Sequence, residues 1–257
     1  MINIEDISMY TVLFLILTGF LAGFIDSIVG GGGLIATPAL LLTGLPPSVA
    51  LGTNKLSATV GSLTSSIVFI RSGKVNMKLV SILFPLSLCG AVLGVFLVSI
   101  LSAEDLKIII LVLLTVVSVY TVAKKDWGTT STYKKLTVKT AVLFGILMFS
   151  IGFYDGFIGG GTGSLLIFAF LFVGFDFVHA AGNAKILNFA SNIAALITFM
   201  YLDSVHYGYG IPLAMAMFLG SLCGARLAIT KGTSFIKVVF ITVSIALIAK
   251  NAWDMLH

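Results

Sequence analysis

The sequence predicts an all-α, polytopic transmembrane helix bundle of about ten segments, arranged as two inverted five-segment repeats with Gly-broken short helices. Composition is the first observation behind this prediction: 58% of the 257 residues are hydrophobic and 10% are charged, whereas a soluble domain is about 25% charged. So few charges cannot cover a water-facing surface, so most of the surface faces lipid. The second observation is a series of apolar stretches near the ~20 residues that span a bilayer. The third is an internal repeat.

The first half is predicted to hold five segments. Its first segment is read as a retained span rather than a signal peptide, because the residues before it carry Glu5 and Asp6 and no cation. A run of glycines separates the first segment from a short second one, and Pro46 and Pro47 precede a long third one that contains many polar residues. The five segments are Met9–Val29, Leu34–Gly44, Ser48–Ile70, Leu79–Leu101 and Ile108–Ala123.

The second half follows the same order after a polar linker. Its five segments are Ala141–Ile158, Ser164–Gly174, Val178–Leu202, Gly208–Ile229 and Val238–Trp253. The chain is therefore divided into a first repeat (1–123), a cytoplasmic linker (124–139) and a second repeat (140–257). If the two short segments do not cross the membrane, the count falls to eight spans.

The cations predict how the chain is threaded. Three loops, Arg71–Lys78, Lys124–Lys139 and Arg226–Lys237, hold three, five and three of the 15 Lys and Arg residues. A ten-segment threading places all three on one side, which the positive-inside rule makes the cytoplasm. Both termini are then outside, and the protein is a multi-pass protein of the inner or plasma membrane.

The two halves share several strings. Gly19–Ile25 resembles Gly152–Ile158, Leu51–Lys55 resembles Ala181–Lys185, and Ser87–Ala91 recurs as Ser221–Ala225. An odd number of spans per half would turn the second half upside down. Inverted repeats are typical of secondary transporters. Duplication that only enlarged a bundle is the alternative, but costly polar groups are repeated as well as packing residues.

Glycine runs break the chain at matching places in the two halves. Gly30–Gly33 precedes one short segment and Gly159–Gly163 precedes the other. Each glycine costs about 1 kcal/mol in a helix relative to Ala, and a break at membrane depth is tolerated only inside protein or beside a watery cavity. Free backbone N–H groups and the N-terminus of a short helix favour an anion. Close packing or a surface turn is the alternative.

Lys55 and Lys185 fall inside apolar segments at matching positions. A lysine there costs several kcal/mol unless it is paired or near water, so we expect the two ammonium groups to bind an anion. The alternatives are snorkelling or ion pairs with Asp26 or Asp155. Those aspartates each precede a glycine run by four residues, and they are candidates for carrying a coupling proton, for counter-ions or for helix caps.

The remaining residues indicate neither a cofactor site nor an enzyme. Cys89 and Cys223 and three scattered histidines form no metal-ligand pattern, so no metal and no cofactor is expected. No nucleophile, base or metal constellation indicates an enzyme. The cations lie in the loops, where they set the orientation in the membrane, and no nucleic acid is expected as a partner. The expected partners are a small anion and the lipid bilayer. The oligomeric state stays open, with a homodimer as one candidate.

With these residues in hand, the chain resembles the sulfite exporter TauE/SafE family, also called the toluene-sulfonate uptake permeases. The resemblance runs over Gly19–Lys55, with Thr37-Pro38 and Gly52-Thr-Asn-Lys55 after the glycine run, and is echoed at Gly152–Lys185. It implies proton-coupled transport of sulfite, sulfonates or carboxylates, with two matched motifs forming the site. The predicted substrate-binding residues are Gly30, Gly31, Gly32, Gly33, Thr53, Asn54, Lys55, Gly159, Gly160, Gly161, Gly163, Asn183 and Lys185. The second half departs from the pattern at Thr162 and Ala184.

Three functions therefore stay in competition. The leading hypothesis is a proton-linked anion transporter. An anion channel would use the same cradle without alternating access. A cation carrier would use Asp26 and Asp155 and would not need the two lysines.

Overall fold

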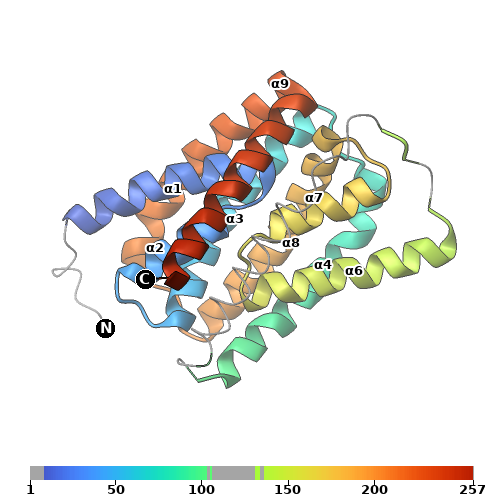
Figure 1. Ribbon diagram of the computed structural model, residues 1–257. Coiled ribbons are helices and arrows are strands. Elements are labelled where there is room, and N and C mark those ends of the chain that lie inside the picture. Colours follow the sequence, from blue (N-terminus) through green and yellow to red (C-terminus); the bar gives the residue numbers. More distant parts are fainter. Residues whose placement is uncertain (1–8, 103–104, 106–130, 134–135, 257) are drawn as a thin grey trace.

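The computed structural model describes residues 9–102, 105, 131–133 and 136–256, and within them the fold is helical without strands (Figure 1). The predicted segment Ile108–Ala123 and most of the linker 124–139 lie outside the described residues. The described helices are α1 (Met9–Val29), α2 (Gly33–Leu42), α3 (Pro47–Arg71), α4 (Met77–Ile100), α6 (Val138–Phe157), α7 (Thr162–Phe172), α8 (Phe177–Tyr201) and α9 (Tyr207–Leu256).

Five of these helices are long and apolar enough to cross a membrane: α1, α4, α6, α8 and the first part of α9, Tyr207–Gly232. This confirms the prediction of a helical membrane protein. The last two predicted segments are joined in α9, but Gly232 has non-helical dihedral angles (φ 72°, ψ −164°). Beyond this kink the helix folds back across the bundle toward the C-terminus (Figure 1).

The two short helices do not have the length to cross. At 1.5 Å per residue, the 10 residues of α2 and the 11 of α7 extend about 15 Å, half of the ~30 Å hydrocarbon core. Each doubles back along the helix before it. Leu40 of α2 belongs to the same apolar cluster as Leu15 of α1. The ring centroids of Phe170 in α7 and Phe144 in α6 are 5.4 Å apart. Their lengths fit the eight-span alternative.

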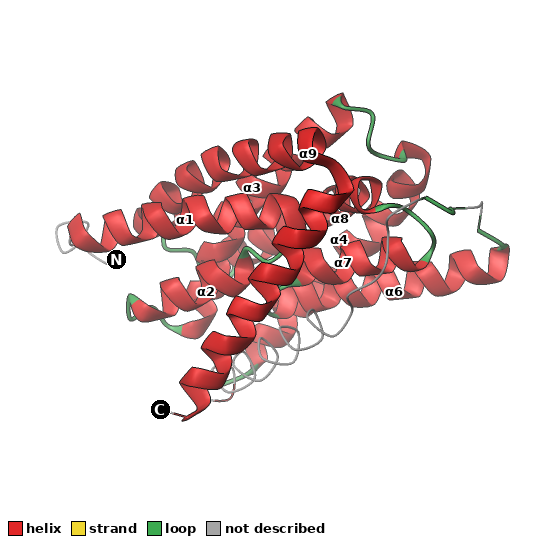
Figure 2. Ribbon diagram, turned by 45° about the horizontal axis from the view of Figure 1, so that its top comes forward, coloured by secondary structure: helices red, strands yellow, loops and turns green. Residues whose placement is uncertain are grey.

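The long helices lie alongside one another, and the second part of α9 crosses them (Figure 2). Their chain directions divide them into two groups, of which the first is α1, α3 and the first part of α9. The first part of α9 runs parallel to α1, because Gly19 lies against Leu213 while Gly224 lies against Ser27. It also runs parallel to α3, since His206 at its start contacts Thr53 and Ser221 further along contacts Gly61.

The other group consists of α4, α6 and α8. Gly152 and Gly156 of α6 pack on Ser87 and Ala91 of α4, in the same chain direction. Helix α8 runs against α3, because Lys55 near the start of α3 contacts Asn192 late in α8, and Phe69 near the end of α3 contacts Gly182 early in α8.

Glycines bring these helices close together. A Cβ atom on Gly220 would lie 2.1 Å from the carbonyl oxygen of Phe20 in α1, and one on Gly94 would lie 2.1 Å from that of Phe153 in α6. Small residues allow such backbone contact between membrane helices. These glycines therefore serve close packing between the helices. Helices α3 and α8 lie in the middle of the bundle and bury most of its polar side chains.

Candidate functional site

The two glycine turns meet in the core of the bundle. Gly30 has φ +80°, which favours glycine, and a Cβ on it would lie 2.2 Å from the carbonyl carbon of Gly163. Ser164 joins the turns: its backbone N–H donates to the oxygen of Gly30 at 3.0 Å, and its hydroxyl donates to the oxygen of Val29 at 2.8 Å. The two breaks, far apart in the sequence, form a single junction.

A first ion pair lies beside the second glycine turn. Lys55 Nζ of α3 is 2.7 Å from Asp155 Oδ1 of α6, and both side chains are 1% exposed. The ammonium also donates to Asn192 Oδ1 at 3.1 Å. The other carboxylate oxygen accepts from Ser191 Oγ and, at 3.4 Å, from Asn188 Nδ2. This carboxylate therefore has three side-chain donors.

A second ion pair joins the other two predicted residues. Lys185 Nζ of α8 is 2.8 Å from Asp26 Oδ2 of α1; the lysine is 0% exposed and the aspartate 13%. The other oxygen of Asp26 accepts from the backbone N–H of Gly32 at 3.1 Å. Asp26 therefore links Lys185 to the N-terminus of α2.

The pairs are crossed between the halves. Each lysine stands on the long polar helix of one half, and each aspartate stands on the broken helix of the other half. Lys55 also lies at the glycine turn of the opposite half, since a Cβ on Gly159 would be 2.5 Å from its Nζ. Of the alternatives left open by the sequence, the lysines form ion pairs in this conformation, and they do not snorkel.

Backbone groups of the glycine turns surround this junction. Gly32 and Gly161 are the N-cap residues of α2 and α7. A Cβ atom added to Gly33 would lie 3.2 Å from the carbonyl oxygen of Gly159. The N–H groups of Gly31 and Gly160 donate no hydrogen bond to any residue that the structure describes. Both residues are buried, so these two amides are unused donors in the core.

Three predicted residues lie away from the ion pairs. Thr53 Oγ1 accepts from the N–H of His206 at 2.9 Å, and Asn183 Oδ1 accepts from the N–H of Asn76 at 2.8 Å. Each thereby holds the start of a helix in the opposite half, α9 or α4. Asn54 is buried, and its Oδ1 finds no hydrogen-bond partner in the described part of the chain.

Sequence reasoning missed five contributors to the junction. Asn188, Ser191 and Asn192 were visible as polar neighbours of Lys185, yet they hydrogen-bond to the other pair. Ser164 ties the turns, and the Tyr154 hydroxyl donates to the oxygen of Gly160 at 2.6 Å. The available signal was the density of polar residues after Lys185 in an otherwise apolar segment, which marks a buried polar helix face.

A lipid-embedded helix bundle with buried ion pairs at paired broken helices is the architecture of a membrane transport protein. The family model for the sulfite exporter TauE/SafE matches residues 15–251, and the chain belongs to that family. This is a family of membrane transporters and not of enzymes, so the protein is a membrane transporter.

Several relatives match over nearly their whole length. A probable membrane transporter protein of Sinorhizobium is 38% identical, covering 98% of this chain and 97% of its own. One of Haemophilus influenzae is 36% identical over 97% of both chains. The probable membrane transporter protein YfcA of Escherichia coli K12 is 35% identical over 93% of this chain and 89% of its own. No solved structure matches the chain.

Proposed function

We propose that the protein is a proton-coupled secondary transporter of a small anion, of the class of sulfur oxyanions, organosulfonates or carboxylates. The observation that carries the proposal is the crossed arrangement of Lys55–Asp155 and Lys185–Asp26 at the junction of the glycine turns. In this proposal the lysines bind the substrate and the aspartates carry the proton.

Charge balance gives the coupling. An anion and the aspartate carboxylate compete for one ammonium group, because a second negative charge at a buried pair is unfavourable. Protonation of Asp26 or Asp155 releases its lysine, which then binds the anion. The site is neutral when empty, as ammonium with carboxylate, and neutral when loaded, as ammonium with substrate anion and a carboxylic acid. The transporter can therefore change conformation with the site either empty or loaded without burying a net charge, whereas an anion bound without the proton would bury one.

The glycine turns supply the rest of the anion cradle. The N–H groups of Gly31 and Gly160 have no acceptor among the residues that the structure describes, and the N-termini of α2 and α7 carry partial positive charge at the same junction. Broken half-helices whose N-termini face an anionic substrate recur in secondary transporters. The ammonium groups are buried in this conformation, so in this proposal the arrangement is an occluded state of the transport cycle.

Helix directions support an inverted repeat. Helices α1 and α3 of the first half run against α6 and α8 of the second, and the lysines and aspartates exchange between the halves in the same way. Such a relation provides two equivalent arrangements, one open to each side. The basic loops at the ends of α3 and of the first part of α9 lie at one end of the bundle; we place that end in the cytoplasm.

Proteoliposome flux tests this function. An inward proton gradient should drive accumulation of sulfite, an alkylsulfonate or a small carboxylate, and Lys55→Ala and Lys185→Ala should each abolish it. Asp26→Asn and Asp155→Asn should leave exchange of the anion but remove gradient-driven accumulation. Flux that survives both lysine changes would overturn the anion site. An anion channel, the alternative, would show no stimulation by anion on the opposite side, whereas a carrier would.

A further inference from the structure

We propose that the groove between α3 and the first part of α9 is a binding site for an anionic membrane phospholipid, with its phosphate held by Arg71 and Arg226. This site is separate from the ion pairs, and it does not depend on the substrate assignment above.

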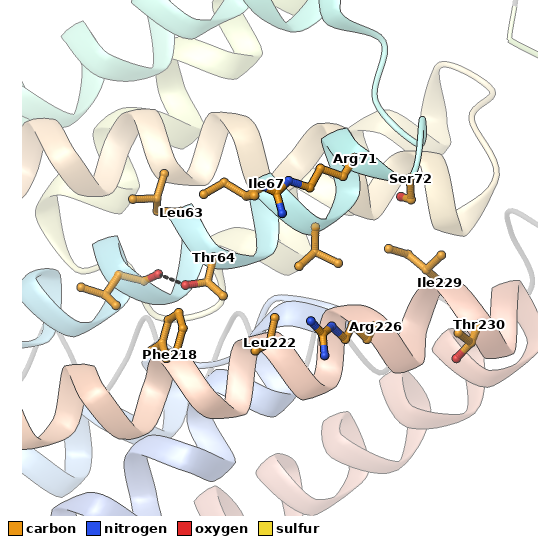
Figure 3. Close-up of a pocket in the computed structure, with 12 residues that line it drawn as sticks. Leu63, Thr64, Ile67, Arg71, Ser72, Phe218, Leu222, Arg226, Ile229 and Thr230 are labelled. Atoms are coloured by element: carbon orange, nitrogen blue, oxygen red, sulfur yellow. Dashed lines mark hydrogen bonds between the residues drawn. The ribbon is translucent and has the colours of Figure 1, made fainter.

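The groove has a volume of about 660 Å³ and two contrasting regions (Figure 3). Most of its wall is aliphatic or aromatic, with Leu63 and Ile67 on α3 and Phe218 on α9. The hydroxyl of Thr64 in this wall donates to the oxygen of Val60 in its own helix at 2.7 Å. The wall therefore favours contact with an acyl chain and provides few hydrogen-bond donors for a small hydrated anion.

Cations occupy one end of the groove. Arg71 comes from the last turn of α3 and Arg226 from α9, and Figure 3 shows their guanidinium groups on facing sides of the gap. Both side chains are exposed, and neither has an acidic partner within the described residues. A guanidinium fork matches phosphate oxygens in bidentate geometry. Ser72 and Thr230 add hydroxyl groups at the same end.

The geometry commits the site to a lipid. Leu63, Ile67 and Phe218 are 41%, 42% and 43% exposed, so the apolar wall opens toward the hydrocarbon region. Arg71 is the last residue of α3 and Arg226 lies six residues before the kink at Gly232, so both stand near the end of a helix, where we expect headgroup phosphates. Basic pockets between transmembrane helices bind anionic headgroups. Inorganic phosphate would leave the apolar wall unused, and the cationic group of a zwitterionic lipid would be repelled by the two arginines.

The equivalent place in the other half lacks this chemistry. Counting from the paired lysines, Tyr201 of α8 stands where Arg71 stands in α3. Packing of the two helices therefore does not require a cation at this position. Because α3 and α9 belong to opposite halves, a lipid bound to both would tie the halves together at one end of the bundle.

Native mass spectrometry of the detergent-purified protein tests the site, with phosphatidylglycerol, phosphatidylcholine and inorganic phosphate as three separate probes. We expect phosphatidylglycerol adducts that weaken by at least about tenfold in R71Q/R226Q. Lys78→Gln is the matched control, because Lys78 is an exposed cation in the same basic loop that does not line the groove. R71K/R226K keeps the charge without the fork and should fall between wild type and R71Q/R226Q.

Three results would overturn the proposal. Equal binding of phosphatidylcholine would remove the charge recognition, and equal binding of phosphate alone would remove the lipid. An effect of Lys78→Gln as large as that of R71Q/R226Q would show a diffuse surface charge instead of a site. Both arginines are exposed, so R71Q/R226Q should unfold at the same temperature as wild type. The single variant R71Q, which loses one of the two charges, repeats this stability measurement.

Discussion

The two lysine–aspartate pairs occupy matching positions but have different surroundings. Asp155 is 1% exposed and accepts hydrogen bonds from Ser191 and Asn188 in addition to its lysine. Asp26 is 13% exposed, and beyond its lysine it accepts from one backbone group, the N–H of Gly32. We infer from this difference that the first pair contributes more to holding the two halves together and that the second is the more accessible to a proton or an anion.

The largest expected effect comes from Asp155→Asn. This change leaves the ammonium of Lys55 buried without a counter-ion, which should lower the free energy of unfolding by about 3 to 5 kcal/mol. Asp26→Asn should cost less, because that aspartate is less buried than Asp155 and has fewer hydrogen-bond donors to lose. Thermal unfolding of the two variants in the same detergent measures the difference. Equal losses would break the proposed asymmetry.

Gly30→Ala should cost about 2 to 4 kcal/mol, since it adds φ strain and overpacking against the backbone of Gly163. The matched control is Gly31→Ala, whose added Cβ would meet nothing closer than 3.8 Å. Thermal unfolding and flux of both variants test whether the junction supports the two pairs. A Gly31→Ala variant as unstable as Gly30→Ala would contradict the close contact.

Removing both partners of the first pair should be less harmful than removing one. We expect Lys55→Met combined with Asp155→Asn to recover about 2 kcal/mol relative to Asp155→Asn alone, because no buried charge remains unpaired. Flux should stay absent. A full double-mutant cycle on thermal unfolding measures this coupling, and additive single losses would show that the two groups do not interact.

The smallest expected effect concerns the hydroxyl that supports Asp155. Ser191→Ala removes a hydrogen bond to a carboxylate and should cost about 1.5 kcal/mol. Ser57→Ala is the control on the other polar helix, because the Ser57 hydroxyl donates only to the oxygen of Asn54 in its own helix. Chemical or thermal unfolding resolves the pair of variants; a larger loss in Ser57→Ala would count against the fastening role of the first pair.

Much of this architecture could be predicted from the sequence. Apolar length placed the described helices to within a few residues, and the glycine runs marked the two turns, because each run holds four glycines, which cannot continue a helix in lipid. The cost of a lysine in a span singled out Lys55 and Lys185. What the sequence left open was their partners, since either aspartate could reach either lysine until the helix directions were known.

String matching gives the wrong register for the first helix of each half. It aligns Gly19 with Gly152, yet Gly152 precedes Asp155 by three residues, and the glycine that precedes Asp26 by three is Gly23. The ion pairs therefore place the match one helical turn later. Glycines four residues apart on both helices permit either alignment, because each superposes small residues on small residues; the equal spacing from each aspartate to its glycine run was the signal that distinguishes the two.

The crossed pairing also constrains how the chain is made. Lys55 is separated from Asp155 by 100 positions, and Asp26 from Lys185 by 159. At about 5 to 20 residues per second, the ribosome adds the missing carboxylate for Lys55 roughly 5 to 20 s after the lysine itself. During that interval the nascent first half holds charged groups without their final counter-ions. Because an unpaired charge is costly in the bilayer interior, we expect the two halves to settle there together.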